Sequence, residues 1–146
     1  MSDDAASRIG NILLGLLFAL LGLVLLGIAA GLALDRHEFL ARAQTADGVV
    51  SRLNAGGAHP EIAFTTGAGE KISYPQGGFI SIHRPGQTVR VHYLPEWPSG
   101  SAVIDDPGAL WGVPVVMGGM GLIFGIAGVS RVVRRSRGAG GSQQRR

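Results

Sequence analysis

The side chains that could carry catalytic or metal chemistry in this sequence are few and scattered. All four histidines, His37, His59, His83 and His92, lie in the middle of the chain, and none has the spacing of a zinc motif relative to another. His59 with Glu61 is the best local pair, but it would need a third ligand from elsewhere. Cysteine is absent, which excludes thiolate catalysis and cysteine-ligated metal.

The remaining polar groups favour structural roles. No nucleophile elbow surrounds Ser73, Ser81 or Ser101. The adjacent acids Asp105 and Asp106 stand just before a Pro-Gly pair and an apolar run, where they more plausibly end a strand than act as an acid–base pair. We therefore expect no catalytic residue, no metal and no cofactor. A metal-dependent hydrolase is the least favoured hypothesis.

Two uncharged apolar runs flank the middle segment. The first, residues 9–34, is longer than the roughly 20 residues that cross a hydrocarbon core. A cleaved signal peptide is its alternative, but the apolar region of a signal peptide has only about 7–15 residues. The second run holds a span at 110–130, with Trp111 at its start in the headgroup zone. The predicted segments are an N-terminus 1–8, helix 9–34, domain 35–109, helix 110–130 and a basic, disordered tail 131–146.

Arginines after the second run predict the orientation. Positive residues stay on the cytoplasmic side, so both termini are expected in the cytoplasm of a bacterium and the domain outside its cytoplasmic membrane. These arginines also favour anionic lipids as a partner at the cytoplasmic face. No aromatic residues are interleaved with them, so nucleic acid is not expected as a partner. The membrane-surface residues are Arg131, Arg134, Arg135, Arg137 and Trp111.

Small residues form stripes on both predicted helices. Glycines spaced three or four residues apart lie on one helix face and let another backbone approach closely. We expect helix packing through Gly27, Gly31, Gly118, Gly121, Gly125 and Gly128, with Gly15, Ala19 and Gly22 as a second small surface. The partner face is either the other helix of this chain or a second copy in a homo-oligomer. Neither span contains an ionisable residue, so an ion path is not expected.

The middle segment alternates apolar and polar residues between turns, which predicts strands. We expect strands at 48–53, 61–65, 71–74, 88–94 and 102–104, with turns at 54–57, 66–69 and 84–86. Residues 76–83 resist assignment, and Phe79, Ile80 and Ile82 are expected to cover the barrel, as a short helical turn or an extra strand. The predicted fold is α+β: two transmembrane helices flanking a small five-stranded β-barrel or sandwich of OB or SH3 type.

Several of these segments resemble a known family. Gly48-Val49-Val50, the run 59–64, the run 86–98 and Ala102-Val103-Ile104 before a span resemble the bacterial domain-of-unknown-function family numbered 3592. The resemblance implies a helix, β domain, helix layout at a membrane and carries no activity. Its motif residues here are Pro60, Phe64, Gly86, Val89, Val91, Tyr93, Pro95, Trp97 and Pro98. They also have structural interpretations, since Trp97 could cover the open end of the barrel or rest on the headgroup layer.

Two non-enzymatic functions follow from this layout. The first is a membrane-anchored envelope protein whose extracytoplasmic β domain binds or braces a protein or glycan. The alternative is an accessory or immunity-type subunit that docks onto another membrane protein through its glycine-rich helices. Both imply a protein partner or a homo-oligomer.

Overall fold

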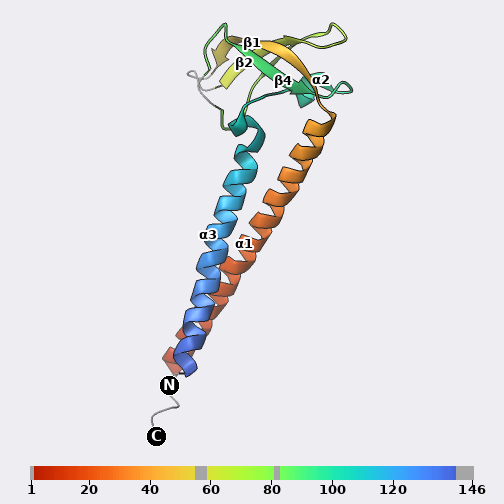
Figure 1. Ribbon diagram of the computed structural model, residues 1–146. Coiled ribbons are helices and arrows are strands. Elements are labelled where there is room, and N and C mark those ends of the chain that lie inside the picture. Colours follow the sequence, from red (N-terminus) through yellow and green to blue (C-terminus); the bar gives the residue numbers. More distant parts are fainter. Residues whose placement is uncertain (1, 55–58, 81–82, 141–146) are drawn as a thin grey trace. The chain divides into compact units, whose positions relative to one another are not determined.

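The computed structural model describes residues 2–54, 59–80 and 83–140, and side chains within 5–54, 59–80 and 83–134 (Figure 1). Its elements, in chain order, are α1 (Ser2–Arg42), β1 (Gln44–Asn54), β2 (His59–Thr65), β3 (Lys71–Pro75), β4 (Thr88–Tyr93), α2 (Pro98–Ser101), β5 (Val103–Ile104) and α3 (Pro107–Gly140). They form two compact units. One contains residues 1–30 and 115–146, and the other residues 31–114.

The two long helices are apolar and mostly unburied. α1 has 41 residues and α3 has 34, so each extends beyond the apolar run that predicted it. Both are long and apolar enough to cross a membrane, and in each helix only 11% of the apolar 18-residue stretch is buried inside the protein. Such exposure of leucine, isoleucine and valine is costly in water and favourable in lipid. This supports a membrane location, while the side on which the termini lie stays a prediction.

The five strands form one antiparallel sheet in the order β3-β2-β1-β4-β5. All five predicted strands are present, although β1 begins earlier than expected, at Gln44, and pairs there with Tyr93 of β4. A bulge between Val50 and Arg52 shifts the β1–β2 register. Extra residues of this kind bend a strand and increase its twist, which curves the sheet. The predicted α+β fold is confirmed, with the sheet as a half-barrel.

The core fills the inner face of this half-barrel. Strand alternation places every second residue inward, as the burial patterns of β2 and β3 show. The core residues are Val50, Ile62, Phe64, Ile72, Tyr74, Val91, Tyr93 and Ile104. Three aromatic rings meet here: Phe64 packs edge-on against Tyr74 at 6.1 Å and tilted against Tyr93 at 5.4 Å between centroids. Val103 and Leu110 are also buried.

The turns follow the glycines. Gly69 and Gly86 have φ of 84° and 83°, in the predicted turns 66–69 and 84–86. The turn predicted at 54–57 lies outside the described residues beyond Asn54. Of the segment expected to cover the barrel, Ile80 packs against the core, whereas Phe79 is 59% exposed and Ile82 is outside the described residues. The ring of Phe79 lies close to Gly112, so it covers the first turns of α3.

Candidate functional site

Among the described residues, those considered for chemistry form only isolated pairs, His92 with Asp105 and Glu61 with Ser73. No cluster of three or more His, Asp or Glu side chains that could hold a metal occurs in the described ranges. His37 and His59 are exposed, His83 is buried, and His92 Nε2 lies 3.5 Å from Asp105 Oδ1. Asp106 Oδ1 instead accepts hydrogen bonds from the backbone N–H groups of Gly108 and Ala109 at the start of α3. It therefore acts as a helix cap.

Glu61, the proposed partner of His59, serves the sheet. Its carboxylate accepts hydrogen bonds from Asn54 Nδ2 and Ser73 Oγ, both at 2.9 Å, and Arg52 Nη2 lies 3.8 Å away. These two hydrogen bonds, first Asn54 and then Ser73, hold the pKa of Glu61 below its ordinary value, and the Arg52 charge acts in the same direction. The carboxylate therefore ties β1, β2 and β3 together next to the bulge.

Gln76 joins the two open sides of the half-barrel. Its side chain is buried, and its Oε1 accepts hydrogen bonds from the Ile104 backbone N–H at 2.9 Å and from the Tyr74 hydroxyl at 3.1 Å. Its Nε2 donates to the Gly77 carbonyl at 2.7 Å. β3 and β5 are not paired in the described sheet, so this amide supplies the acceptor that a neighbouring strand would.

The motif residues divide between core and surface. Pro60, Phe64, Val91 and Tyr93 are buried. The Tyr93 hydroxyl donates to Gln44 Oε1 and accepts from the Gly67 N–H, so it fastens the turn between β2 and β3 to β4. The other motif residues are more exposed: Val89 is half-buried, Pro98 begins α2, and Gly86 and Pro95 are exposed.

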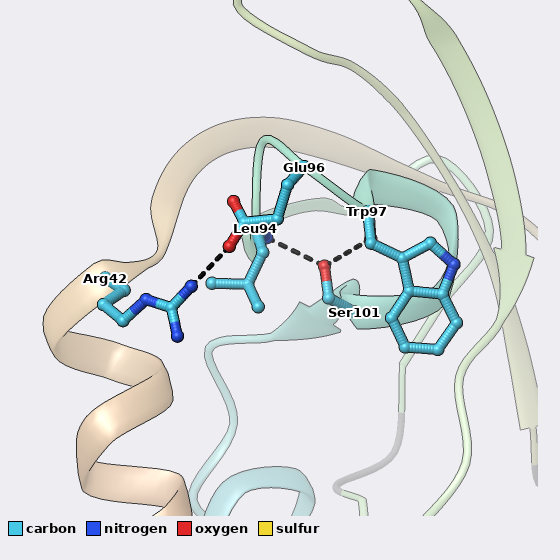
Figure 2. Close-up of polar contacts among 5 residues, drawn as sticks. All are labelled: Arg42, Leu94, Glu96, Trp97 and Ser101. Carbon is cyan, nitrogen blue, oxygen red and sulfur yellow. Dashed lines mark hydrogen bonds and ion pairs between the residues drawn. The ribbon is translucent and has the colours of Figure 1, made fainter.

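Trp97 is the most exposed large apolar residue among those described between residues 35 and 109, with 63% of its surface accessible. Figure 2 shows how its turn is held. Ser101 Oγ donates to the Trp97 carbonyl at 2.7 Å and accepts from the Leu94 N–H at 2.8 Å. Arg42, at the end of α1, forms an ion pair with Glu96. Of the two positions expected for Trp97, this exposure fits the headgroup layer better than the open end of the barrel.

An open groove of about 360 Å³ runs beside this turn. It is lined by Leu32, Asp35, Arg36, Phe39, Leu94, Trp97, Gly100 and Ser101. The indole stacks so closely on Gly100 that a side chain at this position would collide with it. The guanidinium carbon of Arg36 lies 5.3 Å from the centre of the Phe39 ring, a cation–π distance. The groove thus combines apolar walls with one negative and one positive side chain.

A second open groove crosses the outer face of the sheet. It has a volume of about 440 Å³ and is lined by Phe64, Ile72 and the outward residues of β1, β2 and β3, namely Asp47, Val49, Ala63, Thr65, Lys71 and Ser73. Val49 is 43% exposed although it pairs with Ala63 in the middle of the sheet. A central apolar residue among mixed charges is a common composition for a protein-binding surface.

The α3 glycines expected to pack helices lie against α1. A methyl group built on Gly128 would lie 2.5 Å from the Gly15 carbonyl oxygen, and one on Gly121 would lie 3.0 Å from the Gly22 carbonyl oxygen. Gly118 faces Ala29, and a side chain at Gly22 would collide with the backbone of Gly125. The two helices run antiparallel (Figure 1), and their backbones approach closely at these glycines. The rings of Phe18 and Phe124 are stacked, with their centroids 5.6 Å apart.

On α1 the packing stripe differs from the one first considered. A Cβ added at Gly27 or Gly31 would have no neighbouring atom within 4 Å in the described structure. The buried small residues of α1 are Gly15, Gly22 and Ala29 instead. Their heptad spacing is the signal that could have identified this face, because a seven-residue repeat keeps one seam toward a partner helix.

The membrane-surface residues are only partly described. Arg131 lies over the Phe18 ring, with its guanidinium carbon 5.0 Å from the ring centre, and Arg134 is exposed. Trp111 is half-buried in the first turns of α3. The side chains of Arg135 and Arg137 lie outside the described residues, as do residues 141–146.

These features define a class of protein, in which two candidate membrane helices flank a small β domain with open surface grooves. The chain is 51% identical over 128 residues to the immune protein Tsi4 of Pseudomonas aeruginosa, which covers 88% of each protein. The chain belongs to the family of this immune protein and is non-enzymatic. No family model matches the chain, so the resemblance to the domain-of-unknown-function family numbered 3592 stays a prediction. No solved structure matches it.

Proposed function

We propose that this protein is an immunity protein, anchored in the cytoplasmic membrane by α1 and α3, that protects its cell by binding a toxic protein. The observation that carries the proposal is the 51% identity to an immune protein along 88% of both chains. This favours the immunity-type function over a bracing role in the envelope.

The structure offers two surfaces for such a partner. The α3 glycine face is covered by α1, so docking by the helices would use the uncovered face at Gly27 and Gly31. The β domain offers the outer groove around Val49. We favour the β-domain groove, because its charged and apolar residues can discriminate between protein partners, whereas Gly27 and Gly31 lie in an uncharged apolar run.

Protection is tested by deleting the gene in its own bacterium and growing the deletion strain in contact with the parental strain. The deletion strain should lose viability only in contact, and a plasmid copy of the gene should restore its survival. Survival of the deletion strain in contact, under conditions where the parent kills a sensitive strain, would contradict the immunity function. Crosslinking in native membranes followed by mass spectrometry should then recover a toxic protein as the partner.

Two substitutions separate the surfaces. Val49→Arg places a charge in the outer groove without touching the core, and Gly27→Leu fills an open face of α1 without contacting α3. Neither should unfold the protein. Loss of protection in Val49→Arg alone would support docking by the β domain, and loss in Gly27→Leu alone would support docking by the helix.

A further inference from the structure

We propose that the groove beside Trp97 binds the headgroup of a zwitterionic phospholipid, phosphatidylethanolamine, in the membrane leaflet on the β-domain side. The proposal rests on the membrane anchoring proposed above, and it assigns a ligand to a surface distinct from the protein-binding groove at Val49. Its starting point is the order of residues along α1, where the uncharged run 9–34 ends and charged residues follow at once.

The groove lies where that change of polarity occurs. Leu32 belongs to the last turn of the apolar run, and Asp35 and Arg36 are the first charges after it, yet all three line the same groove. If the run lies in hydrocarbon, its end lies at the level of the lipid headgroups. The groove therefore continues the lipid-facing surface of the helix into the headgroup layer.

The exposed indole fits this position. Trp97 is amphipathic, and its ring has one face against Gly100 and 63% of its surface open. Tryptophan is enriched at membrane interfaces because its apolar ring and polar N–H suit a layer that is wet on one side. Two hydrogen bonds of Ser101 hold the backbone of the turn that carries the ring (Figure 2).

The two charges select the headgroup. Asp35 and Arg36 form no ion pair with any residue in the described ranges. Neighbouring residues on a helix diverge by about 100°, so the two side chains are separated around the groove rather than paired with each other. Arg36 can donate N–H groups to a phosphate while its guanidinium stacks on Phe39. Asp35 can accept from an ammonium, which phosphatidylethanolamine carries and phosphatidylglycerol lacks.

The first test uses the two tryptophans of the chain. The full-length protein with Trp111→Phe is placed in nanodiscs of phosphatidylethanolamine and phosphatidylglycerol, so that Trp97 is the single fluorophore. Its emission should be blue-shifted, and bromine near the glycerol end of the acyl chains should quench it more than bromine near the methyl end. Emission typical of water, unquenched by either lipid, would overturn the proposal, as would a blue shift that occurs only when a protein partner is added.

Trp111 distinguishes failure of this proposal from failure of membrane anchoring. In the matched Trp97→Phe protein, Trp111 reports the start of the second candidate span. Quenching of Trp111 without quenching of Trp97 would leave the anchoring standing and reject the groove. If neither tryptophan is quenched, both proposals are wrong.

The second test addresses the headgroup. Native mass spectrometry of protein released from the mixed nanodiscs should show phosphatidylethanolamine enriched over phosphatidylglycerol. The double variant Asp35→Asn with Arg36→Gln should lose this enrichment, whereas Arg84→Gln, which removes an exposed charge from a distant turn, should retain it. Equal retention of both lipids by the unmodified protein, or unchanged enrichment in the double variant, would contradict the assignment.

Discussion

The helix pair and the β half-barrel are packed by opposite means. In the helix pair the closest backbone contacts are made by small residues, and many large side chains are exposed: Val115, Ile123 and Ile126 are each at least 65% exposed. In the half-barrel the large side chains point inward, and Val50, Ile62 and Val91 are 1% exposed or less. The same residue types are therefore buried in one unit and exposed in the other.

The difference follows from the solvent that each unit is built for. In water, burying apolar area contributes about 25 cal/mol per Å², so the sheet gains by enclosing its isoleucines and valines. In lipid, the surrounding tails are as apolar as leucine, so helices gain chiefly from close van der Waals contact between backbones. Small residues allow that contact. Core substitutions should thus act in opposite directions in the two units: shortening a side chain damages the sheet, and lengthening one damages the helix pair.

The largest effect is expected in the sheet. Ile62 is fully buried and contacts both neighbouring strands, so Ile62→Ala should destabilise the β domain by about 2–5 kcal/mol, which is a large part of the stability of so small a domain. Hydrogen exchange of β2 in the full-length protein measures the effect. Val49→Ala on the outer face is the matched control and should change exchange little. Equal effects of the two substitutions would mean that the inward and outward faces are assigned wrongly.

In the helix pair the reverse substitution is the damaging one. A side chain at Gly22 would meet the Gly121 carbonyl oxygen and the backbone of Gly125, which cannot move aside as a side chain can. Gly22→Leu should cost about 1–3 kcal/mol or more. Because the chain has no cysteine, Phe18→Cys with Phe124→Cys provides a unique pair for a bifunctional crosslinker. Crosslinking of this pair should be weaker in the protein that also carries Gly22→Leu than in the protein that keeps Gly22.

The control for the helix pair is Gly27→Leu, which adds the same side chain on the same helix where no atom lies within 4 Å. Its crosslinking should equal that of the unmodified helices. If Gly27→Leu separates the helices and Gly22→Leu does not, α1 packs through its other face.

The sequence was sufficient to predict the strands and the two long helices, but not the faces through which the helices pack. Alternation and long apolar runs identified the five strands and the two long helices, because these patterns are local properties, whereas the four-residue helix α2 was not predicted. Residue size alone could not choose between Gly15, Gly22 and Gly27, Gly31 as the face of α1, since both stripes are small. The heptad spacing of Gly15, Gly22 and Ala29 favours the first stripe, whereas the residues of α3 that lie opposite it are given only by the three-dimensional structure.

Residues 76–83 show the same limit. No periodicity reveals that Gln76 accepts a hydrogen bond from the backbone of Ile104, since the two are 28 residues apart. Likewise, Glu61 looked like a metal ligand beside His59 because sequence shows the neighbour and not the hydrogen-bond donors Asn54 and Ser73. Polar residues are ambiguous in sequence because their partners come from other strands.

Gln76→Leu tests the amide that joins β3 and β5. The leucine keeps the volume but leaves the buried Ile104 N–H without an acceptor, at a cost of about 1–3 kcal/mol. The half-barrel should loosen at β5 first, so the Ile104 amide should lose more protection from hydrogen exchange than amides of the β1–β2 pair. Gln87→Leu, in an exposed turn, is the control. Uniform loss of protection across the sheet would show that Gln76 supports the whole core and not this side alone.

The smallest effect is expected for the pH dependence of stability that Glu61 contributes. Because its hydrogen bonds lower the pKa of Glu61 in the folded protein below the ordinary value of 4.5, the carboxylate stabilises the sheet at pH values above its unfolded pKa. That stabilisation is lost as the pH falls through the lower, folded pKa. Glu61→Gln lacks it at every pH, so the difference in melting temperature between the two proteins should be greatest near neutral pH and shrink in acid. Glu70→Gln, which removes an exposed carboxylate, should show no such trend. A difference that grows in acid would mean that the folded sheet favours the protonated carboxyl, opposite to the geometry of Asn54 and Ser73 around it.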